Sequence, residues 1–287
     1  MRFLAYRQGV DGIAMESARG ELLGLRSDHP DYPGSLDDLV GNDEGLRVAA
    51  SAISQYGRPV GLGEFAYLAP LRRPMKILCV GLNYADHSRE SGFEPPTYPT
   101  VFARFATSLV GHAAPIQKPA ISEQLDWEGE LAVVIGKPGR EIPMGDALSH
   151  VGGYSIFNDA TVRDFQFKTT QWTIGKNFDA TGGFGPVLVT PDELPPGCRD
   201  SRLTTRVSGR IVQDASTSDM IFNVATLIHL LSAAMTLERG DLIITGTPAG
   251  VGISRKPPEF MQHGDTCEVS IEGIGTLTNP IVAADRI

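Results

Sequence analysis

Short apolar runs, each closed by glycine or proline, recur along the chain, and they are the feature that most constrains its fold. The sequence holds 32 glycines and 20 prolines in 287 residues. Such runs predict strands, because glycine and proline interrupt regular structure while Val and Ile favour a pleated sheet. The chain lacks the strand–helix alternation of a nucleotide-binding fold, so we expect a β-rich α+β protein. The predicted strands of its main part lie at residues 131–136, 151–158, 185–190, 203–207, 241–245 and 267–271.

Two longer segments have the residue spacing of an α-helix. Apolar residues recur at helical intervals over residues 45–55, in GLRVAASAISQ, and over residues 223–240, in NVATLIHLLSAAMTLERG. Asn223 can cap the start of the second helix, and Gly240 lies just beyond its expected end. These segments are few compared with the strands, which agrees with a β-rich core.

A stretch rich in glycine and proline, PVGLGEFAYLAPLRRP, follows the first predicted helix. Such a stretch is typical of a linker. We therefore place a domain boundary near Pro70. The prediction is a small N-terminal α/β domain over residues 1–70, followed by a larger domain over residues 71–287.

The charge and cysteine content exclude several functions. The formal net charge is −9, and no cluster of Lys and Arg offers the basic patch that nucleic acid or an anionic membrane requires. The cysteines Cys79, Cys198 and Cys267 lie far apart without a Cys-x-x-Cys pair, so we expect reduced thiols. The segment MRFLAYRQGV lacks a basic stretch followed by a sustained apolar run, so we expect no signal peptide, and no window approaches the roughly 20 apolar residues that span a bilayer. We therefore predict a soluble cytoplasmic protein.

Three acidic residues, Glu128, Glu130 and Asp159, are candidates for a metal site. Glu128 and Glu130 lie two apart in DWEGELAVVIG, which predicts a strand, so they share one face with Asp126. Carboxylates on one face repel each other, and a divalent cation that prefers oxygen ligands, such as Mg²⁺, Mn²⁺ or Ca²⁺, removes the conflict. The alternative is an edge strand with its acidic face in water, which spacing alone favours.

Other polar residues could carry chemistry beside these carboxylates. His87 and Glu90 are three apart in ADHSRE, so on one helical turn a carboxylate would orient the imidazole as a general base. Arg163, Gln166 and Lys176 supply donors that suit a substrate carboxylate and a developing enolate oxygen. The alternative for each of them is an ordinary polar group on an exposed loop.

Six motifs follow one another in a fixed order. They are GLNYADHSRE (81–90), SLVGH (108–112), DWEGELAVVIG (126–136), GGYSIFNDATVRDFQ (152–166), WTIGKNFD (172–179) and TGTPAGVG (245–252). This series resembles the fumarylacetoacetate hydrolase family, whose members cleave or rearrange small oxo-acids on a divalent metal. The resemblance covers roughly residues 75–285, and residues 1–70 carry none of it. It implies a mixed β-roll or sandwich as the catalytic domain, often in a homodimer.

The resemblance also implies roles for individual residues. It assigns Glu128, Glu130 and Asp159 as ligands of Mg²⁺ or Mn²⁺, with Ca²⁺ as a further possibility, and it suggests that Asp126 orients bound water behind them. His87 and Glu90 would activate water, and Lys176 would stabilise an enolate. The residues expected to contact substrate are Arg163, Gln166 and Thr247, together with Arg104.

Arg104 departs from the family pattern. Many members carry Lys in P-x-x-F-x-K, and here the run is PTVFARFATSLVG with Arg104 at that place. Arginine keeps the charge but is bulkier, forked and never neutral, which changes the expected geometry of substrate binding.

The expected activity is metal-dependent hydrolysis of a carbon–carbon bond in acylpyruvate-like 2,4-dioxo acids through a metal-bound enolate. An oxaloacetate-type decarboxylase, or an isomerase or hydratase of unsaturated 2-oxo acids, is the alternative on the same site. A non-catalytic, metal-stabilised binding domain is the alternative from another class. In each enzymatic case the partner is a small oxo-acid.

Overall fold

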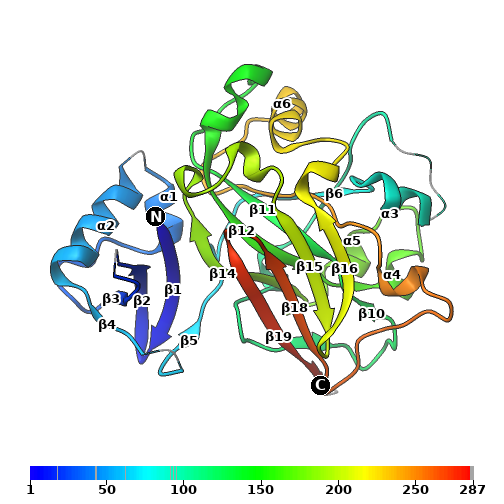
Figure 1. The fold of residues 1–287 in the computed structure, drawn as a ribbon, viewed down its shortest axis with the longest axis horizontal. Coiled ribbons are helices and arrows are strands. Elements are labelled where there is room, and N and C mark those ends of the chain that lie inside the picture. Colours follow the sequence, from blue (N-terminus) through cyan, green and yellow to red (C-terminus); the bar gives the residue numbers. More distant parts are fainter. Residues whose placement is uncertain are drawn as a thin grey trace.

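A computed structural model describes residues 1–284, apart from residues 18, 43, 62, 91, 93 and 95. Within these residues, a 12-stranded sheet runs through the molecule, a five-stranded sheet lies against one face of it, and β10 pairs with β13 (Figure 1). The large sheet has the order β4-β3-β2-β1-β14-β12-β11-β17-β6-β7, with β5 beside β1 and β8 beside β14. The five-stranded sheet has the order β16-β15-β18-β19-β9. The β-rich α+β class is confirmed.

The strands have the following bounds. The N-terminal strands are β1 (Arg2–Gln8), β2 (Val10–Glu16), β3 (Leu22–Arg26), β4 (Arg58–Pro59) and β5 (Ala66–Tyr67). The large sheet continues with β6 (Ile77–Gly81), β7 (Thr100–Ala103), β8 (Leu109–Val110), β11 (Gly129–Ile135), β12 (Val151–Asp159), β14 (Gly182–Val189) and β17 (Leu242–Ile244). The remaining strands are β9 (Ile116–Lys118), β10 (Leu125–Asp126), β13 (Thr161–Val162), β15 (Arg202–Val207), β16 (Arg210–Ser216), β18 (Thr266–Ile271) and β19 (Gly275–Ala283).

The helices are short and lie around the sheets. The α-helices are α1 (Leu36–Val40), α2 (Gly45–Tyr56), α3 (Ala85–Glu90), α4 (Arg163–Gln166), α5 (Thr173–Lys176) and α6 (Val224–Ala234). The 3₁₀ turns are η1 (Ala106–Ser108), η2 (Met144–His150), η3 (Pro191–Glu193), η4 (Pro196–Cys198), η5 (Thr217–Asp219) and η6 (Gly252–Ser254).

Strand β11 lies near the centre of the large sheet and is buried along its whole length. Leu131 and Val133 belong to the cluster that contains Val269 of the five-stranded sheet. Ala132 and Val134 belong to a second cluster, on the opposite face. A strand covered on both faces needs apolar residues at every position, which explains the unbroken run in DWEGELAVVIG.

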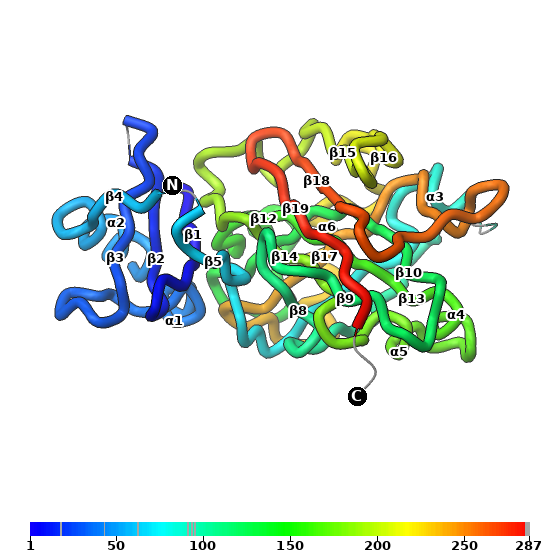
Figure 2. Tube along the Cα trace, turned by 90° about the horizontal axis from the view of Figure 1, so that it is seen from below, coloured from blue at the N-terminus to red at the C-terminus, as the bar shows by residue number. Residues whose placement is uncertain are grey.

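The N-terminal strands extend the large sheet. Strand β1 runs antiparallel to β14, with Arg2 opposite Val189 and Phe3 opposite Leu188. Figures 1 and 2 show this region at one end of the molecule, joined through β1 and β5. Phe3 also shares a hydrophobic cluster with Phe157 of β12. The division of the chain at residue 70 stays a prediction.

The predicted helix over residues 223–240 begins as expected but ends early. The Asn223 side chain accepts a hydrogen bond from the Thr226 amide, and the helix stops at Ala234. Met235 is already extended, and Leu237 forms two backbone hydrogen bonds with Gly139. This pairing with a distant segment ends the helix, so the prediction that it continues to Arg239 was wrong.

The prediction that Asp126, Glu128 and Glu130 lie on one continuous strand was also wrong. Strand β10 ends at Asp126, and β11 begins only at Gly129. Trp127, between them, is buried in the core and donates a hydrogen bond from Nε1 to the Gly250 carbonyl. The alternation of one continuous strand therefore does not relate Asp126 to the two glutamates.

Candidate active site

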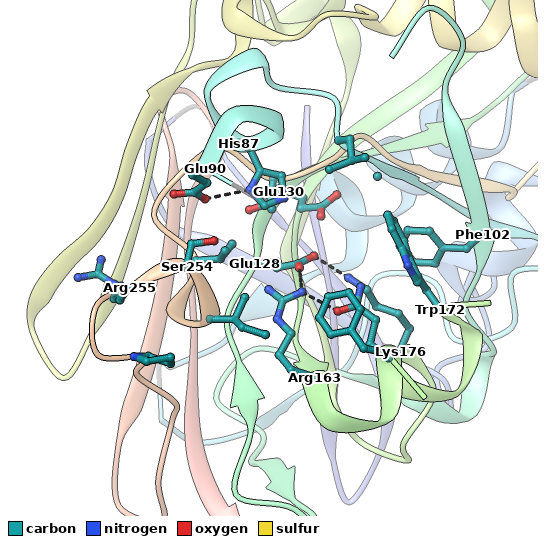
Figure 3. Close-up of a pocket in the computed structure, with 18 of the residues that line it drawn as sticks. His87, Glu90, Phe102, Glu128, Glu130, Arg163, Trp172, Lys176, Ser254 and Arg255 are labelled. Carbon is teal, nitrogen blue, oxygen red and sulfur yellow. Dashed lines mark hydrogen bonds and ion pairs between the residues drawn. The ribbon is translucent and has the colours of Figure 1, made fainter. Parts of the chain in front are cut away.

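A cavity of about 560 Å³ opens where β6, β7 and β11 meet helices α3, α4 and α5 and the segment 247–258. In Figure 3, His87 and Glu90 lie on one side of Glu128, and Arg163 and Lys176 lie on the opposite side. The residues with ionisable side chains that line the cavity are His87, Glu90, Glu128, Glu130, Arg163, Lys176, Arg255 and Lys256.

The three carboxylates predicted as metal ligands lie together beside this cavity, which Glu128 and Glu130 line. One oxygen from each of Glu128, Glu130 and Asp159 lies within 4.8 Å of the others, and all three residues are buried. The antiparallel pairing of β11 and β12 places them, because Gly129 is opposite Asn158. The Asp159 amide also donates to the Glu128 carbonyl over 2.8 Å.

Cations neutralise two of these carboxylates. Lys176 Nζ lies 2.6 Å from both Glu128 Oε2 and Asp159 Oδ2. Arg163 Nη1 lies 2.7 Å from Glu128 Oε1. Burial raises the pKa of Glu128, but the positive charges of Lys176 and Arg163 outweigh it and lower the pKa to about 2. Glu128 is therefore ionised at neutral pH.

Glu130 has a different environment. Its Oε2 accepts a hydrogen bond over 2.5 Å from the Gly246 amide, and this donor is neutral. Burial, and then the negative charges of Asp159 and Glu128, raise the pKa of Glu130 well above its ordinary value. A divalent cation at this position would supply the positive charge that ionised Glu130 needs, and carboxylate oxygens are the ligands that Mg²⁺ and Mn²⁺ prefer. The residues present therefore fit a divalent ion.

Arg104 lies behind the carboxylates. Its side chain is fully buried, forms an ion pair with Asp159, and donates a hydrogen bond to Thr181 Oγ1 over 2.7 Å and to Ser108 Oγ over 3.3 Å. It is not among the residues that line the cavity. The prediction of a substrate contact is thus replaced by a positioning role, in which the forked guanidinium holds Asp159 through one arm and Thr181 through the other.

Asp126 supports Arg163. Its carboxylate accepts hydrogen bonds from the amides of Gly252 (2.7 Å) and Ile253 (2.9 Å), and from Arg163 Nε (2.8 Å). A fourth bond comes from the Trp127 amide over 2.8 Å. Asp126 was expected to orient water beside the metal, but these protein donors use its oxygens.

His87 and Glu90 form the predicted pair on α3. His87 Nδ1 lies 3.0 Å from Glu90 Oε1, and both residues line the cavity. Both oxygens of Glu90 also accept from the Gly250 amide over 3.0 Å, which fixes α3 to the segment that follows β17. Because Glu90 engages Nδ1, the other ring nitrogen is the one available for proton exchange.

The remaining predicted residues also line the cavity. Arg163 donates from Nη1 to Gln166 Oε1 over 2.9 Å, while its buried Nη2 has no hydrogen-bond partner in the structure. Thr247 donates to the Gly129 carbonyl over 3.0 Å. Gln213 Nε2 donates to Thr247 Oγ1 over 2.8 Å, and no motif indicated this residue. Gly246 has a φ of +101°, so the left-handed turn before Thr247 favours glycine.

Comparisons with known proteins agree with this fold. The chain matches the model of the fumarylacetoacetate (FAA) hydrolase C-terminal family over residues 76–282. The protein belongs to this family.

Relatives that are named for an enzymatic activity are similar to this chain over most of their length. The oxaloacetate tautomerase YisK of Bacillus subtilis is 42% identical over 262 residues, which cover 87% of this chain and 87% of the relative. The mitochondrial oxaloacetate tautomerase fahd2 of Xenopus laevis is 39% identical over 266 residues, which cover 92% of this chain and 83% of the relative. A solved fumarylacetoacetate hydrolase from psychrophilic Exiguobacterium antarcticum has a TM-score of 0.87 and 39% identity, and the match covers 99% of this chain and 100% of that chain.

These relatives also bear on the reaction and the compartment. An enzyme family is confirmed, but carbon–carbon hydrolysis is not, because relatives similar over most of the chain are named tautomerases. Within the described residues, no helix is long and apolar enough to cross a membrane. The Xenopus laevis relative is among those named mitochondrial, so a cytoplasmic location stays a prediction.

Proposed function

We propose that this protein catalyses keto–enol tautomerisation of a small 2-oxo acid of the oxaloacetate type. The observation that carries the proposal is the position of the His87–Glu90 pair across one cavity from Lys176 and Arg163, with Glu128 between them. The similarity to oxaloacetate tautomerases favours this reaction over hydrolysis of acylpyruvates. The alternative expected from the sequence was an oxaloacetate-type decarboxylase, or an isomerase or hydratase of unsaturated 2-oxo acids. Tautomerisation is an isomerisation of this kind, and here it becomes the first choice.

Tautomerisation requires one proton to leave and another to arrive. In the enol-to-keto direction, the enol O–H bond breaks, the electron pair of the carbon–carbon double bond forms a new C–H bond at C3, and the C2 carbonyl forms. A divalent cation held by Glu128, Glu130 and Asp159 would act as a Lewis acid toward the C2 oxygen. In this proposal His87, through the nitrogen that Glu90 leaves free, carries the proton to and from C3.

The cationic side of the cavity would hold the substrate. Arg163 is fixed by Asp126 and Glu128, and its Nη2 is a buried donor without a partner. A buried N–H of this kind is stabilised when an anion accepts from it, so Arg163 suits the substrate carboxylate. Lys176 is fully buried beside Glu128 and is placed to stabilise negative charge on the C2 oxygen.

One experiment separates the candidate reactions. Purified protein with Mg²⁺ or Mn²⁺ is mixed with enol-oxaloacetate, and the loss of the enol's ultraviolet absorbance is followed. Pyruvate is measured in parallel with lactate dehydrogenase, and cleavage of acetylpyruvate is measured separately. The proposal expects fast loss of the enol, without pyruvate above the background rate and without cleavage of acetylpyruvate.

Each contrary result identifies another function. Pyruvate formation that matches enol loss would indicate a decarboxylase, and acetylpyruvate cleavage at a comparable rate would indicate the hydrolase. No turnover with or without EDTA would favour a binding domain that holds its metal for structure alone.

A further inference from the structure

The cavity is lined by apolar side chains as well as by the charged cluster. These apolar side chains come from β7, from the loops beside α3 and α5, and from the segment after Gly250. They include Leu82, Phe102, Phe167, Trp172, Ile253 and Pro258.

Two of these apolar side chains, the aromatic rings of Phe102 and Trp172, lie directly beside the charged cluster. Phe102 and Trp172 meet edge to face, with ring centroids 5.6 Å apart and planes at 67°. Lys176 Nζ lies 4.9 Å from the centroid of the Phe102 ring, and Figure 3 shows both rings beside Lys176. The aromatic wall formed by these two rings therefore borders the site proposed for the oxo-acid head, on the side of Lys176.

The backbone is shaped to hold Trp172 there. A Cβ atom at Gly81 would lie 2.3 Å from Cζ3 of the Trp172 ring, so the indole packs closely against the end of β6 in space that only glycine leaves open. Phe102 and Trp172 are only partly buried, and Phe167 is 54% exposed. Aromatic surface left open to water next to a reactive cluster is typical of a ligand site, whereas core packing would have buried it.

The size of the cavity gives the second argument. At about 560 Å³ it lies among sites of roughly 300–1,000 Å³ that enclose drug-sized ligands. Oxaloacetate, a four-carbon acid, is much smaller than such ligands. We propose that the aromatic wall is a subsite for the tail of the substrate, and that this enzyme accepts 2-oxo acids with a planar, apolar substituent beyond the oxo-acid head. This inference rests on the proposed function, because it places the head at the carboxylate cluster.

Binding of two inhibitors tests the subsite without turnover. Oxamate carries an oxo-acid-like head, and oxanilate is the same head with a phenyl group on the amide nitrogen. Their affinities for the Mg²⁺-loaded protein are measured by isothermal titration calorimetry. We expect oxanilate to bind roughly tenfold tighter or more, because the wall removes the phenyl surface from water.

Variants locate the effect. In Trp172→Ala the ratio of the two affinities should fall toward one, and Phe102→Leu should lower it in the same direction. Ile174→Ala is the matched control, because Ile174 lies on the same short helix as Lys176, is 63% exposed and does not line the cavity. It should keep the wild-type ratio.

The outcomes separate the two proposals. Equal affinities in the wild type, or a ratio that Trp172→Ala and Phe102→Leu leave unchanged, would overturn the subsite while the proposed function stands. If neither compound binds, the head site fails, and the proposed function falls together with the inference.

Discussion

Lys176 Nζ lies 2.6 Å from Glu128 Oε2, at the centre of the carboxylate cluster. The ammonium group is buried and also contacts Asp159, so it is part of the cluster that would hold the metal. Lysine has no lone pair to offer a metal when it is charged, so the role that we propose for Lys176 is to balance charge and to stabilise the substrate oxygen.

Replacement of this lysine should separate metal binding from catalysis. In Lys176→Met, tautomerisation should slow by about 10²-fold or more, because charge on the substrate oxygen loses its ammonium partner. Mn²⁺ should still bind, since the ligands remain. Turnover and Mn²⁺ titration on the same sample provide the measurement. A folded variant that has lost Mn²⁺ binding would contradict this role and make Lys176 a support for the ligands.

Replacement of Arg104 should lower the stability of the protein, because Arg104 forms a buried ion pair with Asp159. Removal of one partner of a buried ion pair leaves the other charge uncompensated, which costs about 3–5 kcal/mol. Arg104→Ala should approach the lower end of that range, since Lys176 still pairs with Asp159. Urea unfolding measures the change in the free energy of unfolding. Arg104→Lys, which keeps the charge, should lose less, and equal losses in both variants would show that the charge is unimportant.

The framework of the fold could be predicted because local patterns determine it. Strands β11 and β12 are apolar runs with glycine nearby, and helix α2 follows its apolar spacing. The end of α6 could not be predicted, because Leu237 pairs with Gly139, almost a hundred positions earlier. The break between Asp126 and Gly129 likewise depends on the amides of Gly252 and Ile253.

The same limit applies to the candidate site. Glu128, Glu130 and Asp159 could be named from motif order, and the structure brings them together. The position of Arg104 could not be inferred, since its partners Asp159 and Thr181 are contributed by other strands and loops. Phe102 and Trp172 lie within recognised segments, but an aromatic residue beside a motif does not reveal which way its ring points.

Replacement of His87 should slow tautomerisation without weakening the binding of an oxo-acid mimic. His87→Ala should slow tautomerisation by roughly 10²–10⁴-fold, because the proton carrier is absent. Glu90→Gln should slow it less, since the imidazole remains but is less firmly oriented. Oxalate affinity in the presence of Mg²⁺ is the control, and it should change little in either variant. Failure of oxalate to bind His87→Ala would make His87 a binding residue.

The raised pKa of Glu130 leads us to predict that the stability of the protein depends on pH. Its pKa is raised well above the ordinary value of 4.5, so in the metal-free protein the folded state keeps a proton that the unfolded state releases. The free energy of unfolding should therefore fall as the pH rises above 4.5. The pKa of Glu128 is lowered from 4.5 to about 2, so this residue changes the free energy of unfolding only below pH 4.5. There its stabilisation of the fold is lost as the pH falls.

Unfolding by urea in EDTA, from about pH 5 to about pH 8, measures this slope. Glu130→Gln removes the titrating group, so its profile should be flatter than that of the wild type, and saturating Mg²⁺ should flatten the wild-type profile as well. Parallel profiles for the wild type and Glu130→Gln in EDTA would contradict the assignment.

The central claim is that Glu128, Glu130 and Asp159 together hold a divalent ion. Calorimetric titration of metal-free protein with Mn²⁺ tests it most directly, with Glu130→Gln as the ligand variant and Glu64→Gln, an exposed glutamate, as its control. The account predicts one Mn²⁺ per chain in the wild type and in Glu64→Gln, and a loss of binding in Glu130→Gln. No binding by the wild type, or unchanged affinity in Glu130→Gln, would contradict it.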